Sequence, residues 1–70
     1  MEITFTIHAE LRLERRKLLK EEVIDAIKSP DKTIKKHGRY YYQKKLNRGT
    51  IEVVVEKTES NLNVVTIYWL

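Results

Sequence analysis

The chain has 70 residues, and its 14 Lys and Arg against 10 Asp and Glu give a formal net charge of +4, which favours an acidic partner: RNA, DNA or an acidic protein. A chain of this length forms one domain, residues 1–70, that buries only about 60% of its unfolded surface, so a partner or a homodimer would add stability. It has no cysteine and no apolar run of roughly 18 residues, which excludes disulfides, cysteine nucleophiles and membrane spans and leads us to expect a cytoplasmic protein.

The first seven residues alternate between apolar and polar side chains. Ile3, Phe5 and Ile7 are separated by polar residues, a period-two pattern that predicts a short strand with one buried face. Thr6 then offers a side-chain oxygen of the kind that caps helices. We therefore expect a first helix from about Ile7 to Arg16.

The stretch KLLKEEVIDAIKSP, residues 17–30, has the pattern of a second amphipathic helix. Leu19, Val23 and Ile27 recur every four residues, acidic residues occupy the first turn, and Pro30 follows the end. Turn residues then separate three strand-like runs, at residues 39–46, 50–57 and 62–69.

The first two of these runs form a hairpin whose register can be predicted. Pairing Leu46 with Ile51 places apolar residues on one face and sets Lys45 opposite Glu52. The same register gives three further pairs: Lys44–Val53, Tyr42–Val55 and Tyr41–Glu56. Together the elements predict an α+β domain of order β-α-α-β-β-β, in which two helices pack on one face of an antiparallel sheet that the first strand joins. We expect the other face of the sheet to be more exposed to solvent.

The first helix carries a basic stripe. At about 100° per residue, His8, Arg12 and Arg15 fall within about 60° of one another, and Arg16 lies beside them. Arginine side chains suit phosphate oxygens, and the positive end of the helix disfavours the charged form of a first-turn histidine, so His8 is a candidate general base. The alternative is a solvated helix face, in which the arginines pair with the two glutamates of the same helix.

The stretch HGRYYYQKK, residues 37–45, is the second candidate site. His37 stands beside a glycine, and Arg39 and Tyr41 share one face of the following strand. Aromatic rings between basic residues are typical of single-stranded RNA binding, because bases stack on the rings and cations hold the backbone. The other two tyrosines point to the opposite face and suit the core, which leaves Tyr41 as the stacking candidate. Against this reading, glutamates on the neighbouring strand would repel phosphate.

Other chemistries have less support in the sequence. Ser29 and Ser60 lie in turns with no local Ser-His-acid pattern, which disfavours a serine hydrolase. Two histidines without cysteine or clustered acids do not suggest a zinc site. No glycine-rich phosphate loop is present, which argues against nucleotide hydrolysis and dinucleotide cofactors. We therefore expect no cofactor.

The order of these features resembles a small, widespread protein family of unknown function. The shared features follow one another along nearly the whole chain: His8-Ala9, Arg12, Arg16-Lys17-Leu18, the helix residues 21–27, Pro30, Gly38-Arg39 and the closing run of residues 64–68, VVTIY. Members of that family usually have a glycine where this chain has Lys17 and an asparagine where it has Ser29. We therefore expect the turn between the helices to differ.

That family in turn resembles the BrnT-like and RelE/ParE-like bacterial and archaeal toxins, which have a helical N-terminal half followed by an antiparallel sheet. In the RNA-cleaving members, Arg, Lys, His and Tyr side chains cleave the phosphodiester without a metal, and a cognate antitoxin covers the site. For this chain the resemblance implies a RelE-like fold. It also implies functional roles at four motif positions: His8, Arg12, Arg16 and Arg39.

The sequence therefore supports one leading hypothesis and one alternative. In the first, the chain is a toxin-like RNA-binding domain and a candidate metal-independent endoribonuclease, with an antitoxin-like protein as a further partner. Its phosphate and nucleic-acid contacts are Arg12, Arg16, Arg39 and Tyr41, and its proton-transfer residue is His8 or His37. Such a site requires the two helix arginines to lie near Arg39 or His37. In the alternative, the chain is a non-catalytic module that binds a protein or a nucleic acid.

Overall fold

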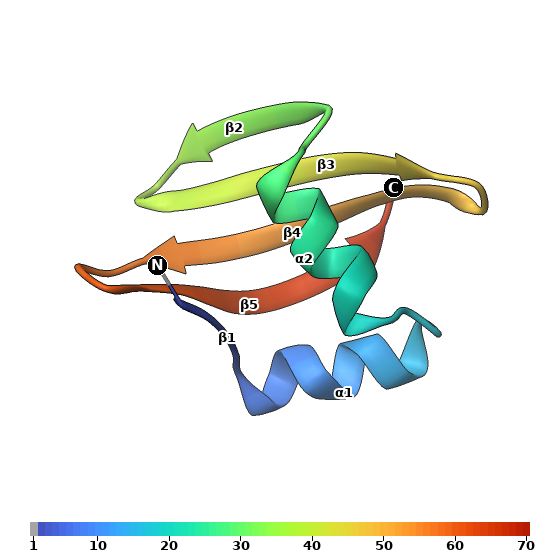
Figure 1. Cartoon of the computed structure of the whole chain (residues 1–70), viewed down its shortest axis with the longest axis horizontal. Helices are drawn as coiled ribbons and strands as arrows, with labels where there is room; N and C mark the ends of the chain where they lie inside the picture. Colours follow the sequence, from blue (N-terminus) through green and yellow to red (C-terminus); the bar gives the residue numbers. More distant parts are fainter. Residues whose placement is uncertain (1) are drawn as a thin grey trace.

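The computed structural model describes residues 2–70, which form two helices and one five-stranded sheet (Figure 1). The elements follow in the order β1 (Glu2–Phe5), α1 (Ile7–Arg15), α2 (Lys20–Lys28), β2 (Lys32–Lys36), β3 (Arg39–Leu46), β4 (Gly49–Lys57) and β5 (Asn61–Trp69). The strand order across the sheet is β1-β5-β4-β3-β2, with β1 parallel to β5 and the other neighbours antiparallel. The predicted α+β fold with two helices against the sheet is confirmed. Within residues 2–70, neither nine-residue helix is long and apolar enough to cross a membrane.

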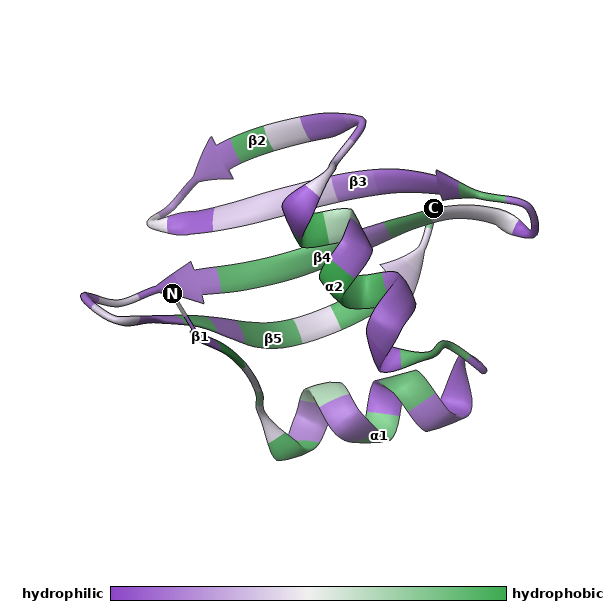
Figure 2. Ribbon diagram, viewed as in Figure 1, coloured by the Kyte–Doolittle hydropathy of each residue, from purple (hydrophilic) through white to green (hydrophobic). Residues whose placement is uncertain are grey.

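The helices and the sheet form two layers with the core between them. In Figure 1, α2 crosses the central strands and α1 lies along the side of β1 and β5, where its contacts are concentrated. Figure 2 shows that hydrophobic residues gather on β4, β5 and parts of both helices, whereas β2 and β3 are largely hydrophilic. The largest fully buried side chains are Val23 from α2 and five from β4 and β5: Ile51, Val53, Val55, Val64 and Ile67.

The first helix begins and ends at recognisable caps. The Thr6 side chain accepts a hydrogen bond from the Ala9 N–H at 3.0 Å, which confirms the predicted N-cap. At the other end the Leu18 N–H donates to the Leu13 carbonyl at 2.9 Å, and both leucines are buried. Between them Lys17 has φ 54°, the left-handed conformation that glycine adopts without strain in this type of helix end. Lys17 thus keeps the turn that the usual glycine would make.

Strand β2 is the one element of the described chain that the sequence did not predict. Its residues, KTIKK, include a single apolar side chain, Ile34, and all but Ile34 are exposed. A strand at the edge of a sheet needs little apolar surface, because its neighbour supplies the backbone hydrogen bonds. Pairing with β3 therefore decides its conformation, and its lysines leave a charged edge.

The predicted register of the β3–β4 hairpin is wrong by two residues. Leu46 pairs with Gly49 and Lys44 with Ile51, so the turn contains only Asn47 and Arg48, and Gly49 takes φ 138°. The predicted register needed a four-residue loop. A shift by two residues leaves every side chain on its predicted face, because side chains alternate with period two. It changes the partners: the predicted Lys45–Glu52 and Tyr41–Glu56 pairs are replaced by Gln43–Glu52 and Arg39–Glu56.

Candidate functional site

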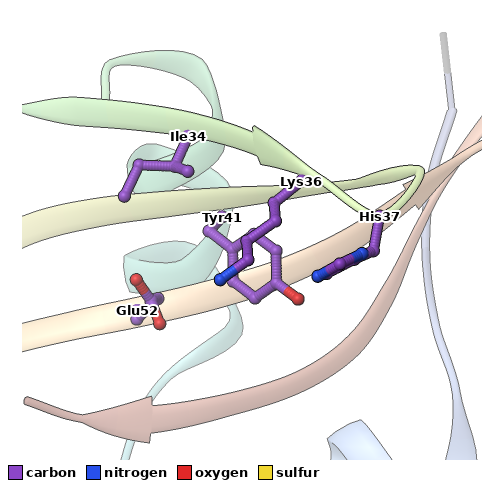
Figure 3. Close-up of a pocket in the computed structure, with 5 residues that line it drawn as sticks. All are labelled: Ile34, Lys36, His37, Tyr41 and Glu52. Atoms are coloured by element: carbon purple, nitrogen blue, oxygen red, sulfur yellow. The ribbon is translucent and has the colours of Figure 1, made fainter.

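The open face of the sheet carries a pocket of about 280 Å³ (Figure 3). Five side chains line it: Ile34 and Lys36 from β2, His37 from the following turn, Tyr41 from β3 and Glu52 from β4. In Figure 3 helix α2 lies behind the sheet, so these side chains project from the face that the helices leave free. The Tyr41 ring lies between Glu52 and His37 in this view, and Lys36 extends beside the ring.

The turn between β2 and β3 fixes the position of His37. His37 has φ 54° and Gly38 has φ 72°, and the two residues connect strands that pair Lys36 with Arg39. A two-residue loop in which both residues have a positive φ is a type I′ turn. The backbone of such a turn twists in the same sense as the two antiparallel strands that it joins. Because the turn is this short, the imidazole of His37 stays at the end of the pocket, on the side of the Tyr41 hydroxyl in Figure 3.

Glu52 is a buried carboxylate on an otherwise open surface, with only 8% of the residue exposed. Its oxygen Oε2 accepts a hydrogen bond from the Gln43 amide at 2.8 Å, and Oε1 accepts one from the Tyr68 hydroxyl. The hydrogen bond to Glu52, with burial, raises the pKa of Tyr68 to about 12. None of the ion pairs among residues 2–70 includes Glu52, so its negative charge is held by neutral donors alone.

Two cations on this face differ in their partners. Arg39 lies on the same face as Tyr41 and forms an ion pair with Glu56 at 3.5 Å. Lys36 is exposed and takes part in none of the ion pairs of the described chain. Of the two glutamates that are expected to repel phosphate, Glu56 is paired with Arg39 and Glu52 is buried. Lys36 remains as an unpaired positive charge beside the Tyr41 ring.

The basic stripe on α1 forms a separate group. The Arg12 Nε donates to the His8 Nε2 at 3.2 Å. Glu10 pairs with Lys20 at 3.2 Å, and no ion pair of residues 2–70 includes an arginine of α1 or Arg16. The predicted pairing of these arginines with the glutamates of their own helix is therefore wrong, whereas the solvated helix face stays a prediction. Arg16 ends the helix, and its backbone carbonyl accepts from the Trp69 indole at 3.3 Å.

The two predicted groups of site residues do not meet. Helix α1 packs on β5 and β1, whereas His37 lies at the β2 edge, three strand spacings or about 14 Å from β5. Arg39 and Tyr41 also project from the face opposite the helices. The structure thus brings His37 and Tyr41 together and places Arg39 on their face. It leaves His8, Arg12 and Arg16 elsewhere.

Sequence reasoning missed Glu52, Lys36 and Ile34 as pocket residues. The predicted register set Glu52 opposite Lys45, although Glu52 interrupts the apolar run IEVVV. A charge inside such a run is a signal of a buried polar role. Ile34 and Lys36 were missed because β2 was not predicted. Within residues 2–70, no group of three or more His, Cys, Asp or Glu side chains is placed to hold a metal ion.

Comparison with known proteins places the chain in a family. No curated protein and no solved structure matches it. Residues 5–69 match the family described as "Domain of unknown function (DUF4258)". This match covers both helices, the last residue of β1 and all of the other strands. The chain is therefore a member of the DUF4258 family of domains of unknown function.

Proposed function

We propose that the chain binds single-stranded RNA on the open face of its sheet, at the pocket beside the β2–β3 hairpin. The observation that carries this proposal is the unpaired cation of Lys36 beside the half-buried ring of Tyr41, with His37 in the same pocket. An RNA base stacks on an aromatic ring, and the adjoining phosphate is held by a cation. One pocket contains both groups.

The charges of the open face and the family resemblance support RNA over other acidic partners. The carboxylate of Glu56 is paired with Arg39, and that of Glu52 accepts hydrogen bonds from Gln43 and Tyr68, whereas the cation of Lys36 is in no ion pair of residues 2–70. The resemblance to RelE/ParE-like and BrnT-like toxins points in the same direction, because some members of that superfamily cleave RNA. An antitoxin-like protein that covers this face is part of the same proposal.

We expect Lys36→Ala to weaken RNA binding equally for all sequences and to lower the slope of log affinity against log salt by about one, because a phosphate contact carries charge but no base identity. Tyr41→Ala should cost about 1–3 kcal/mol of binding through the loss of one stacked base. The measurement is fluorescence anisotropy of a labelled single-stranded RNA over a series of salt concentrations.

Arg12→Ala is the matched control for this experiment, because it removes one positive charge from α1, away from the pocket. We expect its salt slope to equal that of the unchanged protein. If Arg12→Ala lowers the slope and Lys36→Ala does not, the RNA site lies on the helix and the proposal is wrong. Urea unfolding of each variant checks that the fold is intact, and Lys36 is exposed, so its removal should leave stability within about 0.5 kcal/mol.

A second candidate function is RNA cleavage without a metal, which the position of His37 in the same pocket favours. The 2′-oxygen of the ribose attacks the neighbouring phosphorus, and the bond from phosphorus to the 5′-oxygen breaks, which leaves a 2′,3′-cyclic phosphate and a 5′-hydroxyl. The imidazole of His37 takes the proton of the 2′-hydroxyl, and water supplies the proton of the leaving oxygen. Such proton transfer contributes about 10²–10⁴ in rate.

The test of cleavage is incubation of labelled RNA with the protein in EDTA, followed by analysis of the product ends. We expect cyclic phosphate ends, and we expect His37→Ala to lower the rate by about 10²-fold or more. His8→Ala, which removes the histidine of α1, should leave the rate unchanged. RNA that is retained in a salt-sensitive manner but never cut would instead identify a non-catalytic binding module.

A further inference from the structure

We infer that Glu52 recognises a guanine base that stacks on Tyr41, so that this face prefers RNA with an accessible guanine. The inference rests on the proposed RNA binding and adds base specificity to it. Three features of the pocket carry it: a buried carboxylate with acceptor sites left over, an aromatic ring next to it, and cations that favour a ligand with an attached phosphate.

The first feature is the hydrogen bonding of the Glu52 carboxylate. Each of its oxygens accepts one hydrogen bond from the protein, Oε1 from Tyr68 and Oε2 from Gln43. A carboxylate has about four acceptor sites, two on each oxygen. One site therefore remains on each oxygen, and the two protein donors hold the plane of the group. The carboxylate therefore has the capacity to accept two further hydrogen bonds from a ligand in the pocket that it lines.

The same carboxylate carries an uncompensated charge. Glu52 is more than nine-tenths buried, it lines the pocket, and it belongs to none of the ion pairs of residues 2–70. Burying a carboxylate removes water from it, and neutral donors replace that water only in part. A ligand that supplies two further donors completes the solvation of the group. The pocket thus selects for a pair of adjacent N–H groups.

Guanine is the base that presents such a pair. Its Watson–Crick edge carries the N1–H and the N2 amino group side by side, and both point in the same direction. Adenine and cytosine each present one amino group next to an acceptor nitrogen, and uracil presents one N–H between two carbonyls. Each of these three would place an acceptor against the carboxylate. Recognition of single-stranded RNA commonly uses this edge while the base stacks on an aromatic ring, here Tyr41.

An arginine side chain from a partner protein also presents two parallel donors, so the surrounding charges decide between the two ligands. The cation of Lys36 lines the same pocket, and that of Arg39 lies on the same face. These groups repel an incoming guanidinium and attract the phosphate that a nucleotide brings with it. The pocket volume of about 280 Å³, near the lower end of small-molecule sites, suits one base.

The test uses short single-stranded RNAs that are identical except at one central position, which holds guanine, adenine, cytosine, uracil or inosine. We expect guanine to bind about 5- to 150-fold more tightly than adenine, cytosine or uracil, as for a good bidentate contact. Inosine lacks the N2 amino group, so its affinity should fall between those of guanine and the other bases. This comparison leaves the protein unchanged and does not depend on any variant folding.

Glu52→Gln should abolish the preference for guanine, because an amide cannot accept two hydrogen bonds along the same edge. It should not weaken binding of the uracil-containing RNA, because the amide no longer sets a negative acceptor against the uracil carbonyls. Glu56→Gln is the matched control, since it removes an exposed carboxylate from the same face of the same strand, and it should keep the preference. Urea unfolding establishes that both variants are folded.

The outcomes separate this inference from the proposed function. Equal, salt-sensitive binding of all five RNAs overturns guanine recognition and leaves RNA binding in place. A guanine preference that survives Glu52→Gln overturns the role of Glu52. No binding of any RNA refutes both proposals. Glu52-dependent binding of an arginine-containing peptide without a guanine preference assigns the pocket to a protein partner and also overturns the inference.

Discussion

Replacing Ile67 by alanine is expected to lower the free energy of unfolding by about 2–5 kcal/mol, enough to unfold much of the protein at moderate temperature. Ile67 is 0% exposed and lies on β5, between the helices and the sheet. The substitution removes buried methyl groups and leaves a cavity that the surrounding side chains fill only in part. At about 0.05–0.15 kcal/mol per residue, a domain of this size has a total stability of only about 4–10 kcal/mol.

The measurement is urea unfolding followed by circular dichroism, with two controls. Ile67→Val should cost about 0.5–1.5 kcal/mol, because it removes one methylene group from the same site. Ile7→Ala should change stability by no more than about 0.5 kcal/mol, because Ile7 is 79% exposed. Equal effects of the substitutions at Ile67 and Ile7 would contradict the core as the structure has it.

Replacing Tyr68 by phenylalanine is expected to destabilise the protein by about 1–3 kcal/mol at neutral pH. The Tyr68 hydroxyl donates to the Glu52 carboxylate, which is only 8% exposed. Phenylalanine keeps the ring and removes the donor, so a buried charged group loses one of its two protein hydrogen bonds. Tyr41→Phe is the control, because the Tyr41 hydroxyl lies in the same pocket but forms no hydrogen bond to Glu52.

The same substitution should change how stability depends on pH. The pKa of Tyr68 is raised to about 12 in the folded protein, mainly by its hydrogen bond to Glu52, from about 10 in an unfolded chain. The folded state therefore holds this proton more tightly. The resulting stability is fully present below pH 10 and is lost as the pH rises toward 12. Urea midpoints at several alkaline pH values should fall more steeply for the unchanged protein and for Tyr41→Phe than for Tyr68→Phe.

Local patterns in the sequence were enough to predict most of the fold. The cap at Thr6, the four-residue spacing in α2 and the alternation in β3 and β4 each depend on residues that are close in the chain. The face of each hairpin side chain was predicted for the same reason, since alternation survives a shift of register by two residues. Tyr40 and Tyr42 accordingly pack against the core, as expected.

Features that depend on distant partners were not predicted. The register of β3 against β4 depends on a two-residue turn that is followed at once by Gly49 with a positive φ, whereas the predicted pairing of charges favoured another register. Residues 32–36 form strand β2 because their backbone pairs with the free edge of β3. Their own sequence, KTIKK, does not require a strand. In both cases the deciding energy comes from contacts that the local sequence does not contain.

The residues of the candidate site were likewise predicted from the sequence only in part. Composition and spacing singled out His37, Arg39 and Tyr41, and they also singled out the stripe on α1. Only the strand order placed these groups at opposite sides of the sheet and on different faces. The role of Glu52 depends on Tyr68 from β5 and Gln43 from β3, which reach its carboxylate across neighbouring strands. The sequence determined which chemical groups are present, and the tertiary structure alone decided which of them share a pocket, because strand pairing joins residues that are far apart in the chain.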